Sequence, residues 1–193
     1  MKPILVLAAL ISVACTAGVR NSSPNLGIAA ADSAAIRSDI SYLASDVLEG
    51  RLTGTPGNDS AAAYIARRYD YLRLRAPYPG YLQNFVARSA AGLHTGDTAG
   101  QKTQNVVAIL NGSDPAYRGR YLVVGAHFDH LGRGTRYAMD PQAGDAIRNG
   151  ADDNASGTAA VLQLARMLSI SKPRHSVVFV NFSGFINLRL ASS

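Results

Sequence analysis

Two continuous apolar runs, at residues 121–126 and 177–182, most limit what this chain can fold into. Runs of this length without polar alternation are typical of strands that are covered on both faces. Residues 156–169, between the two runs, repeat apolar side chains at helical spacing. A strand, a helix and a second strand in this order predict a βαβ unit with parallel strands and a right-handed crossover.

The residues before this unit predict two helices and two further strands. Asp32 or Ser33 can cap a helix that carries Ile36, Ile40 and Leu43 on one face. Thr55 and Pro56 are typical of the start of a second helix, which reaches about Leu74. Its buried stripe consists of Ala62, Ile65, Ala66, Tyr69 and Leu72. In the later helix, Ala160, Leu164 and Met167 lie on one face and Val161 and Leu168 on an adjoining one.

The further strands are expected at residues 81–87 and 105–110. With the βαβ unit they indicate an α/β protein, a three-layer α/β/α arrangement with a mixed β-sheet. The 193 residues, 47% of them hydrophobic, suffice for one domain with a core. The formal net charge is +6, but the arginines are scattered and no basic platform with interleaved aromatic residues occurs, so nucleic-acid binding is not expected.

The amino-terminal segment predicts export from the cytoplasm. Residues 1–14 hold one lysine and then an apolar run that is too short to span a bilayer, as in an export signal. The chain's single cysteine, Cys15, stands where a bacterial lipoprotein signal is cut and lipidated, and simple cleavage after Ala14 or Ala17 is the alternative. We expect a flexible spacer at 15–31, and a periplasmic, extracellular or lipid-anchored protein that touches a membrane only through a lipid on Cys15.

Candidate metal-binding residues lie at the end of the first apolar run and just before the helix that follows it. His127 ends the first run, and Asp129 lies two residues on, where it can accept a hydrogen bond from the far ring nitrogen of His127. About two dozen residues later, Asp153 stands in an Asp-Asp-Asn segment that opens the helix. Taken alone, the pair of His127 and Asp129 is typical of a contact at the protein surface. The Asp-Asp-Asn segment, taken alone, is typical of a helix cap. Together, across one crossover, they favour a metal site at the carboxyl ends of the strands. His130 is expected in a loop, on the opposite side of the strand end.

Several spaced motifs resemble the M28 family of zinc peptidases. They are YLASD at 42–46, LEGR at 48–51, GTPG at 54–57, GAHFDHLG at 125–132, GADDNASG at 150–157 and VVFVNFSG at 177–184. The resemblance covers about residues 40–184. It implies a mixed sheet between helices, two co-catalytic zinc ions and a secreted aminopeptidase or related hydrolase that acts on a peptide or protein substrate. By the same resemblance His127 is a ligand of one zinc ion, Asp153 bridges both, and Asp129 orients His127.

The chain departs from the family pattern after Gly184. The family continues with Glu-Glu, the general base and a metal ligand, where this chain has Phe185 and Ile186. Two further ligands, an acid and a histidine, belong to the family's second half, which is not found here. We therefore expect a partial, truncated peptidase domain at 32–184, a non-matching tail at 185–193, weak or absent zinc binding and no activity.

Two other functions remain as alternatives. A non-catalytic envelope protein could keep part of the fold as a binding module. A serine hydrolase could use Ser156 or Ser183 with His127, although the Gly-x-Ser-x-Gly motif of such enzymes is missing around both serines.

Overall fold

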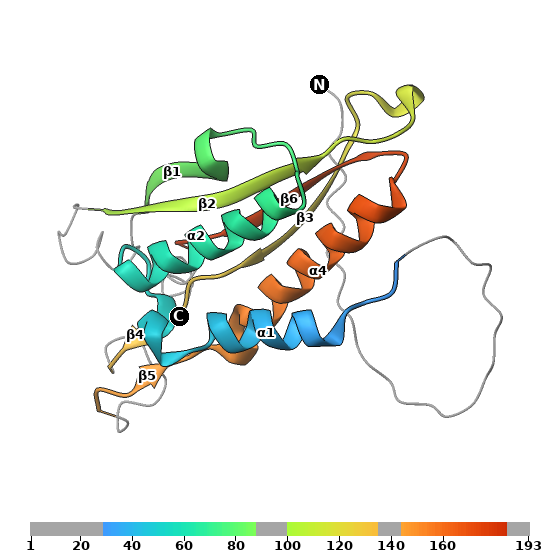
Figure 1. The fold of residues 1–193 in the computed structure, drawn as a ribbon. Helices are drawn as coiled ribbons and strands as arrows, with labels where there is room; N and C mark the ends of the chain where they lie inside the picture. Colours follow the sequence, from blue (N-terminus) through green and yellow to red (C-terminus); the bar gives the residue numbers. More distant parts are fainter. Residues whose placement is uncertain (1–28, 88–99, 135–143, 185–193) are drawn as a thin grey trace, which may run out of the picture.

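The computed structural model describes residues 29–87, 100–134 and 144–184 and shows a four-stranded mixed sheet (Figure 1). The strands are β1 (Leu82–Ala87), β2 (Gln101–Leu110), β3 (Tyr121–His127) and β6 (Ser176–Phe182). Their order is β1-β2-β6-β3, with β2 antiparallel to both of its neighbours and β3 parallel to β6. The predicted mixed sheet and the parallel pairing of the two apolar runs are confirmed. The predicted export signal, Cys15 and the tail at 185–193 lie outside the described residues.

The described residues form three helices, and all three begin where the sequence predicted. Helix α1 (Ser33–Leu43) starts after Asp32, whose carboxylate accepts hydrogen bonds from the backbone of Ala34 and Ala35. Helix α2 (Pro56–Tyr71) starts after Thr55, whose hydroxyl accepts one from the backbone of Asn58. Helix α4 (Ser156–Ser171) joins β3 to β6. None of the helices in the described ranges is long and apolar enough to cross a membrane.

Helices α2 and α4 pack on one face of the sheet, and α1 packs against α4 (Figure 1). On β6 that face presents Val177, Phe179 and Asn181, all fully or almost fully buried. On β2 it presents Val106 and Ala108, which join the same apolar cluster as Leu43, Leu48, Ile65, Tyr69, Leu162 and Ala165. The α/β class with a mixed sheet is confirmed, and the described part of the chain contains one helical layer.

The buried face of α4 differs from the face that the helical spacing suggested. Ala159, Leu162 and Ala165 are buried together with Val161, whereas Ala160 is exposed and Leu164 and Met167 are only partly buried. Alanines at 159 and 165 let the helix sit close over the sheet. Spacing alone could not decide between the two faces, because apolar residues occur all around this helix.

Short elements connect the layers and surround the carboxyl end of β3. They are the 3₁₀ turns η1 (Asp46–Arg51), η2 (Pro79–Tyr81) and η3 (Pro115–Tyr117), the two-residue strands β4 (Gly132–Arg133) and β5 (Ile147–Arg148), and the π-helical turn η5 (Ala151–Ala155). Turn η1 packs against α2, β4 and β5, and η5 packs against α1 and α4. The connection after β3 is thus folded back onto the connection between α1 and α2.

Two pairs of buried polar side chains link the helices to their neighbours. The Tyr69 hydroxyl on α2 donates to Oδ1 of Asn181 on β6 at 2.5 Å. Asp39 on α1, which is 1% exposed, accepts from the Tyr64 hydroxyl at 2.5 Å and faces Arg68 at 3.3 Å. Buried polar groups are costly without partners, so these contacts fix how α2 sits against β6 and α1.

Tyr69→Phe should lower the free energy of unfolding by about 1–3 kcal/mol, because Asn181 loses its buried donor. Tyr71→Phe is the matched control. Tyr71 is 82% exposed on the same helix, so this change should stay within about 0.5 kcal/mol. Urea unfolding followed by circular dichroism measures both, and equal effects of the two variants would contradict the assigned role of Tyr69.

Candidate metal centre

His127, the last residue of β3, has an acidic residue beside each ring nitrogen. Its Nδ1 lies 3.2 Å from the backbone oxygen of Asp129 and 3.5 Å from Oδ1 of the same residue. Its Nε2 lies 3.0 Å from Oδ1 of Asp153. The backbone oxygen of His127 accepts from the Thr158 hydroxyl in the first turn of α4. The structure therefore brings together His127, Asp129 and Asp153, the three residues selected from the sequence.

Asp129 is fully buried behind His127. Its Oδ2 accepts a hydrogen bond from the Thr53 hydroxyl at 2.9 Å. A buried carboxylate held in this way fixes the orientation of the imidazole in front of it. Sequence reasoning missed Thr53, which lies within the LTGTPG segment but has no chemistry of its own to draw attention.

Asp153 comes from the π-helical turn that precedes α4, and its side chain is half exposed. The turn begins after Gly150, which has a φ of 57°, a left-handed conformation that glycine adopts readily. A side chain at Gly150 would collide with the ring of His130, 2.5 Å away, and with the backbone oxygen of Asp153. Glycine at this position therefore lets the turn carrying Asp153 approach His130 closely.

His130 lies closer to the centre than the sequence suggested. It is in a loop, as predicted, but its Nδ1 is 3.9 Å from Oδ2 of Asp153 rather than on the far side of the strand end. Strand alternation stops after Phe128, whose backbone N–H donates to Phe182, and the chain then turns. The alternation of side chains along a strand therefore does not predict on which side His130 lies.

The two histidines have shifted pKa values of opposite sign. Burial lowers the pKa of His127, but the hydrogen bond and charge of Asp129 and the charge of Asp153 outweigh it and raise the pKa above its usual value. Burial lowers the pKa of His130, and the nearby Arg51 and His127 lower it further, against the opposing charges of Asp153 and Asp129. His127 is thus the more basic imidazole at this centre.

Arg51 holds the segments of the centre together. Its guanidinium is fully buried and donates to four backbone oxygens. Nε donates to the backbone oxygen of Phe128 at 2.7 Å, and Nη2 donates to that of Gly150 at 3.0 Å. Nη1 donates to the backbone oxygen of Asn149 at 2.7 Å and also to that of Leu43. These oxygens belong to the end of α1, the loop after β3 and the segment before Asp153. Burial lowers the pKa of Arg51 to about 10, against the raising charges of Asp129 and Asp153, so it stays a cation at neutral pH.

The backbone of η1 has an unusual conformation that places Arg51. Glu49, Gly50 and Arg51 all have positive φ, at 47°, 71° and 51°. A side chain at Gly50 would meet the backbone oxygens of Gly132 and Arg148 at 2.5 and 2.6 Å. Glycine at position 50 therefore allows close contact with β4 and β5, and Arg51, the next residue, points inward.

The donors fit zinc in kind but not in number. Imidazole nitrogen and carboxylate oxygen are both common zinc ligands, and a catalytic zinc normally takes three protein ligands. His127 and Asp153 supply two. Within residues 29–87, 100–134 and 144–184, no group of three or more His, Cys, Asp or Glu side chains is placed to hold a metal ion. Among the described residues, the site thus offers two donors of the kinds that zinc accepts and lacks the third that a catalytic zinc normally takes.

Within the described residues, neither serine of the alternative hydrolase site is paired with a histidine. The Ser183 hydroxyl is hydrogen-bonded to the side chains of Thr103 and Asn58 in the interior. The Ser156 hydroxyl donates to the backbone oxygen of Asp152. These contacts are structural, and a nucleophile needs a base within reach.

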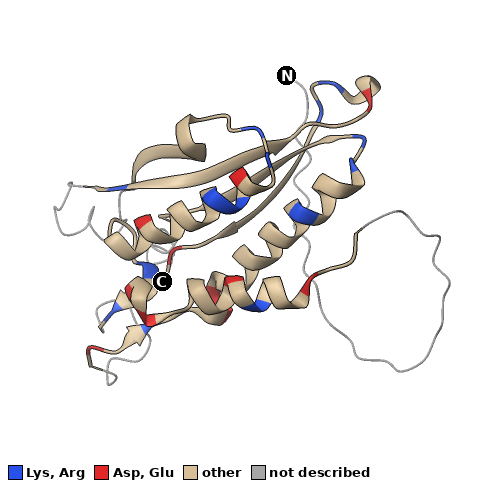
Figure 2. Cartoon of the chain, viewed as in Figure 1, with Lys and Arg blue, Asp and Glu red and all other residues tan. Residues whose placement is uncertain are grey.

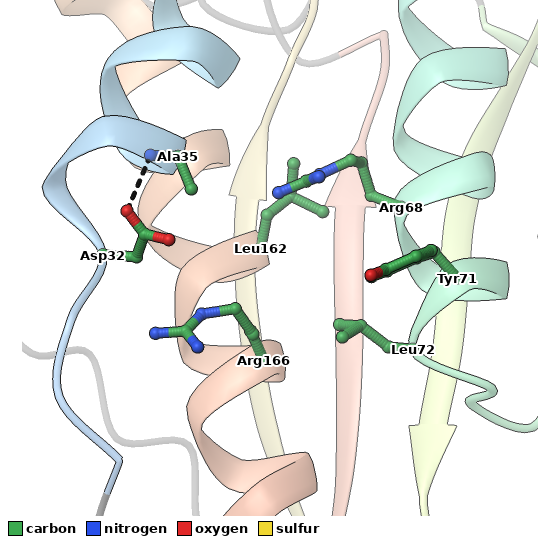
Figure 3. Close-up of a pocket in the computed structure, with 7 residues that line it drawn as sticks. All are labelled: Asp32, Ala35, Arg68, Tyr71, Leu72, Leu162 and Arg166. Carbon is green, nitrogen blue, oxygen red and sulfur yellow. Dashed lines mark hydrogen bonds between the residues drawn. The ribbon is translucent and has the colours of Figure 1, made fainter.

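A pocket between α1, α2 and α4 lies apart from these residues (Figure 3). The two arginines that line this pocket both interact with other groups of the chain. Arg68 pairs with Asp39, and Arg166 donates to the backbone oxygen of Ala30 at 2.6 Å. The pocket is therefore a packing feature of the helical layer.

Comparison with solved structures shows the same α/β fold over about half of their length. A glutaminyl cyclase from Fimbriiglobus ruber matches 86% of this chain and 49% of its own, with a TM-score of 0.66 and 19% identity. A Zn-dependent exopeptidase from Parabacteroides distasonis matches 80% and 47%, with a TM-score of 0.62 and 15% identity. Both similarities concern the fold alone.

Sequence comparison matches part of the chain to a known family. Residues 105–184 of the chain match peptidase family M28. A "Probable zinc metalloprotease" of Pyricularia oryzae is 34% identical over 113 residues, which are 58% of this chain and 19% of the fungal protein. The chain thus spans about a fifth of this relative and about half of the solved structures.

Arg51→Lys should lower the free energy of unfolding by at least about 3 kcal/mol. A lysine cannot donate to four oxygens from three segments, and the oxygens that lose their donor stay buried. Arg67→Lys, at an exposed position of α2, is the control and should cost less than about 0.5 kcal/mol. Denaturant unfolding measures both. A loss below about 1 kcal/mol for the Arg51 variant would sink the assigned role.

In metal-free protein, an NMR titration should give His127 a midpoint above the ordinary value of about 6.5 and His130 a midpoint below it. A raised folded-state pKa stabilises the fold below about pH 6.5, and this contribution disappears as the pH rises through the folded-state value. Asp153→Asn should lower the His127 midpoint, and Asp152→Asn serves as the control. A His127 midpoint below that of His130 would contradict the assigned electrostatics.

Proposed function

We propose that this chain carries part of an exported zinc-dependent aminopeptidase, whose substrates are the amino-terminal peptide bonds of peptides or proteins. The proposal rests chiefly on the approach of His127 to Asp153, with Asp129 behind the imidazole. The match of residues 105–184 to peptidase family M28 supports hydrolysis of a peptide bond. Because glutaminyl cyclases and exopeptidases share this fold, the fold by itself does not select the reaction.

Each residue of the centre has a distinct proposed role. His127 and Asp153 act as zinc ligands, and Asp153 corresponds to the bridging carboxylate of the intact family. Asp129 is a positioning residue: with the Thr53 hydroxyl on its other oxygen, it orients the imidazole. The zinc ions of the family supply an activated water and polarise the substrate carbonyl.

We further propose that the chain as given does not turn over peptides. The M28 pattern has its general base and a further ligand where this sequence has Phe185 and Ile186. An apolar side chain can neither accept the proton of the attacking water nor bind zinc. Loss of general-base catalysis alone typically costs about 10²–10⁴ in rate, and two donors should bind zinc weakly.

Export is proposed from the sequence of residues 1–14. One positive charge, an apolar run and small residues before Cys15 are typical of a signal that is removed during secretion. Either acylation of Cys15 or simple cleavage nearby is compatible with this pattern.

Zinc titration of the purified chain by calorimetry should detect weak binding that depends on the proposed ligands. His127→Ala and Asp153→Asn should each weaken it at least about tenfold, because each removes one of two donors. His175→Ala is the control, since His175 contacts the Tyr117 ring at the η3 turn and this change should leave zinc affinity unchanged. Ile186→Glu should strengthen binding by adding a carboxylate at the family's ligand position.

Hydrolysis of an aminoacyl-p-nitroanilide tests the second part of the proposal. The chain should show the same residual rate as its His127→Ala variant, with and without added zinc. Zinc-dependent turnover by the unmodified chain would overturn the proposed inactivity but leave the ligands in place. Zinc binding that is indifferent to both ligand substitutions would overturn the metal centre itself.

A further inference from the structure

We propose that Asn58 is a positioning residue, which holds the carboxyl end of β6 in a fixed place beside the candidate metal centre. Asn58 lies in the first turn of α2 and is fully buried. A buried amide is costly unless its oxygen and its nitrogen both have partners. Its partners therefore show which segments this side chain joins. The inference rests on the proposed function, because it concerns the segment on which the M28 pattern places further acids.

The amide oxygen of Asn58 faces two buried hydroxyls. The Thr103 hydroxyl, on β2, lies 3.1 Å from Oδ1, and the Ser183 hydroxyl, directly after β6, lies 3.2 Å from it. The two hydroxyl oxygens are 2.8 Å apart. Each hydroxyl can donate once and also accept, so every polar atom of this group is satisfied within it. We call these three side chains the Asn58 cluster, and it joins α2, β2 and the end of β6.

The amide nitrogen of Asn58 is directed toward the loop after β3. Nδ2 donates to the backbone oxygen of Arg51 at 3.2 Å, and the same oxygen accepts from the backbone N–H of His130 at 3.2 Å. A carbonyl oxygen can only accept, so the amide must present its nitrogen to Arg51 and its oxygen to the hydroxyls. One side chain thus connects the end of β6 to the loop that carries Asp129 and His130.

The carboxyl end of β6 lies directly beside the centre. Phe182, its last residue, is the register partner of His127 on β3. The backbone N–H of Ser183 donates to Oδ1 of Asn105 at 3.0 Å. Gly184 then has a φ of 79°, a left-handed conformation that favours glycine. The Asn58 cluster therefore binds the chain at the point where it leaves the strand and changes direction.

Glycine at position 57 lets Asn58 come close enough to make these contacts. A side chain at Gly57 would collide with the backbone oxygen of Leu48 in η1. The first turn of α2 can therefore pack tightly on η1, and from there Asn58 reaches the Arg51 oxygen. The same turn of α2 thus contacts both η1 and the end of β6.

The cluster is uncharged, unlike the centre that it adjoins. Strand β6 carries no Lys, Arg, Asp or Glu along its length (Figure 2), and the cluster consists of an amide and two hydroxyls. Its contacts therefore persist over the pH range in which carboxylates and imidazoles change charge.

Stability alone does not require such a cluster. Replacing both partners of a buried hydrogen bond by apolar groups of the same shape can be nearly neutral. A fully satisfied polar network instead specifies one arrangement of the segments that it joins. In the M28 pattern two acids follow Gly184 directly, so the direction of the chain at this point decides whether they reach the ligands His127 and Asp153.

A double-mutant cycle on zinc affinity, measured by calorimetry on the full chain, tests the proposal. Ile186→Glu adds a carboxylate two residues after Gly184 and should strengthen binding. Asn58→Asp keeps the shape and the acceptor oxygen of the side chain but removes the donor to Arg51. It should reduce the gain from Ile186→Glu at least about fivefold, and should change zinc affinity less than about twofold when residue 186 is isoleucine. A purely structural role would affect both backgrounds equally.

Asn84→Asp is the matched control, because Asn84 is exposed on β1, and it should leave the gain from Ile186→Glu unchanged. Circular dichroism shows whether each variant is folded. Ser183→Ala, which removes a single hydroxyl of the cluster, repeats the cycle and replaces Asn58→Asp if that variant does not fold.

The outcomes separate this inference from the proposed function. An equal gain from Ile186→Glu with and without the intact cluster would overturn the positioning role and leave the zinc ligands in place. So would the lack of any gain when Asn58 is intact, because the end of β6 would then not be directed at the centre. Zinc binding that is indifferent to His127→Ala in every background would overturn the proposed centre, and this inference with it.

Discussion

The buried guanidinium of Arg51 is the interaction on which the candidate centre depends. It joins the end of α1, the loop after β3 and the segment before Asp153 through four backbone oxygens. Backbone oxygens carry no net charge, so the cation is balanced at longer range by Asp129 and Asp153. A buried charge without such partners would be strongly destabilising. Removal of either carboxylate therefore weakens the stabilisation of the Arg51 cation, and it also removes an acidic group beside His127.

Much of the fold followed from the sequence because its signals are local. Asp32 and Thr55 cap helices where capping residues were expected, and the two apolar runs pair in parallel. His127, Asp129 and Asp153 converge because the ends of elements in a βαβ unit meet at one edge of the sheet. These predictions needed only spacing and residue type.

Other features could not be found in this way because they depend on tertiary contacts. The buried face of α4 is chosen by the sheet beneath it, not by its own apolar spacing. His130 approaches Asp153 because the chain turns after Phe128. Thr53 and Arg51 act on oxygens that are far away in sequence, and neither residue type signals such a role by itself.

The partners of Arg51 also determine when the centre can form. Its contacts with Phe128, Asn149 and Gly150 close long loops of the chain, and such contacts form late because the chain entropy must be lost first. Helices α1 and α2 can be present before β3 and the turn carrying Asp153 are held beside them. In the folded state the segments that carry His127 and Asp153 are held by bonds from the same guanidinium. We therefore expect formation of the His127–Asp153 contact to be coupled to completion of this part of the fold.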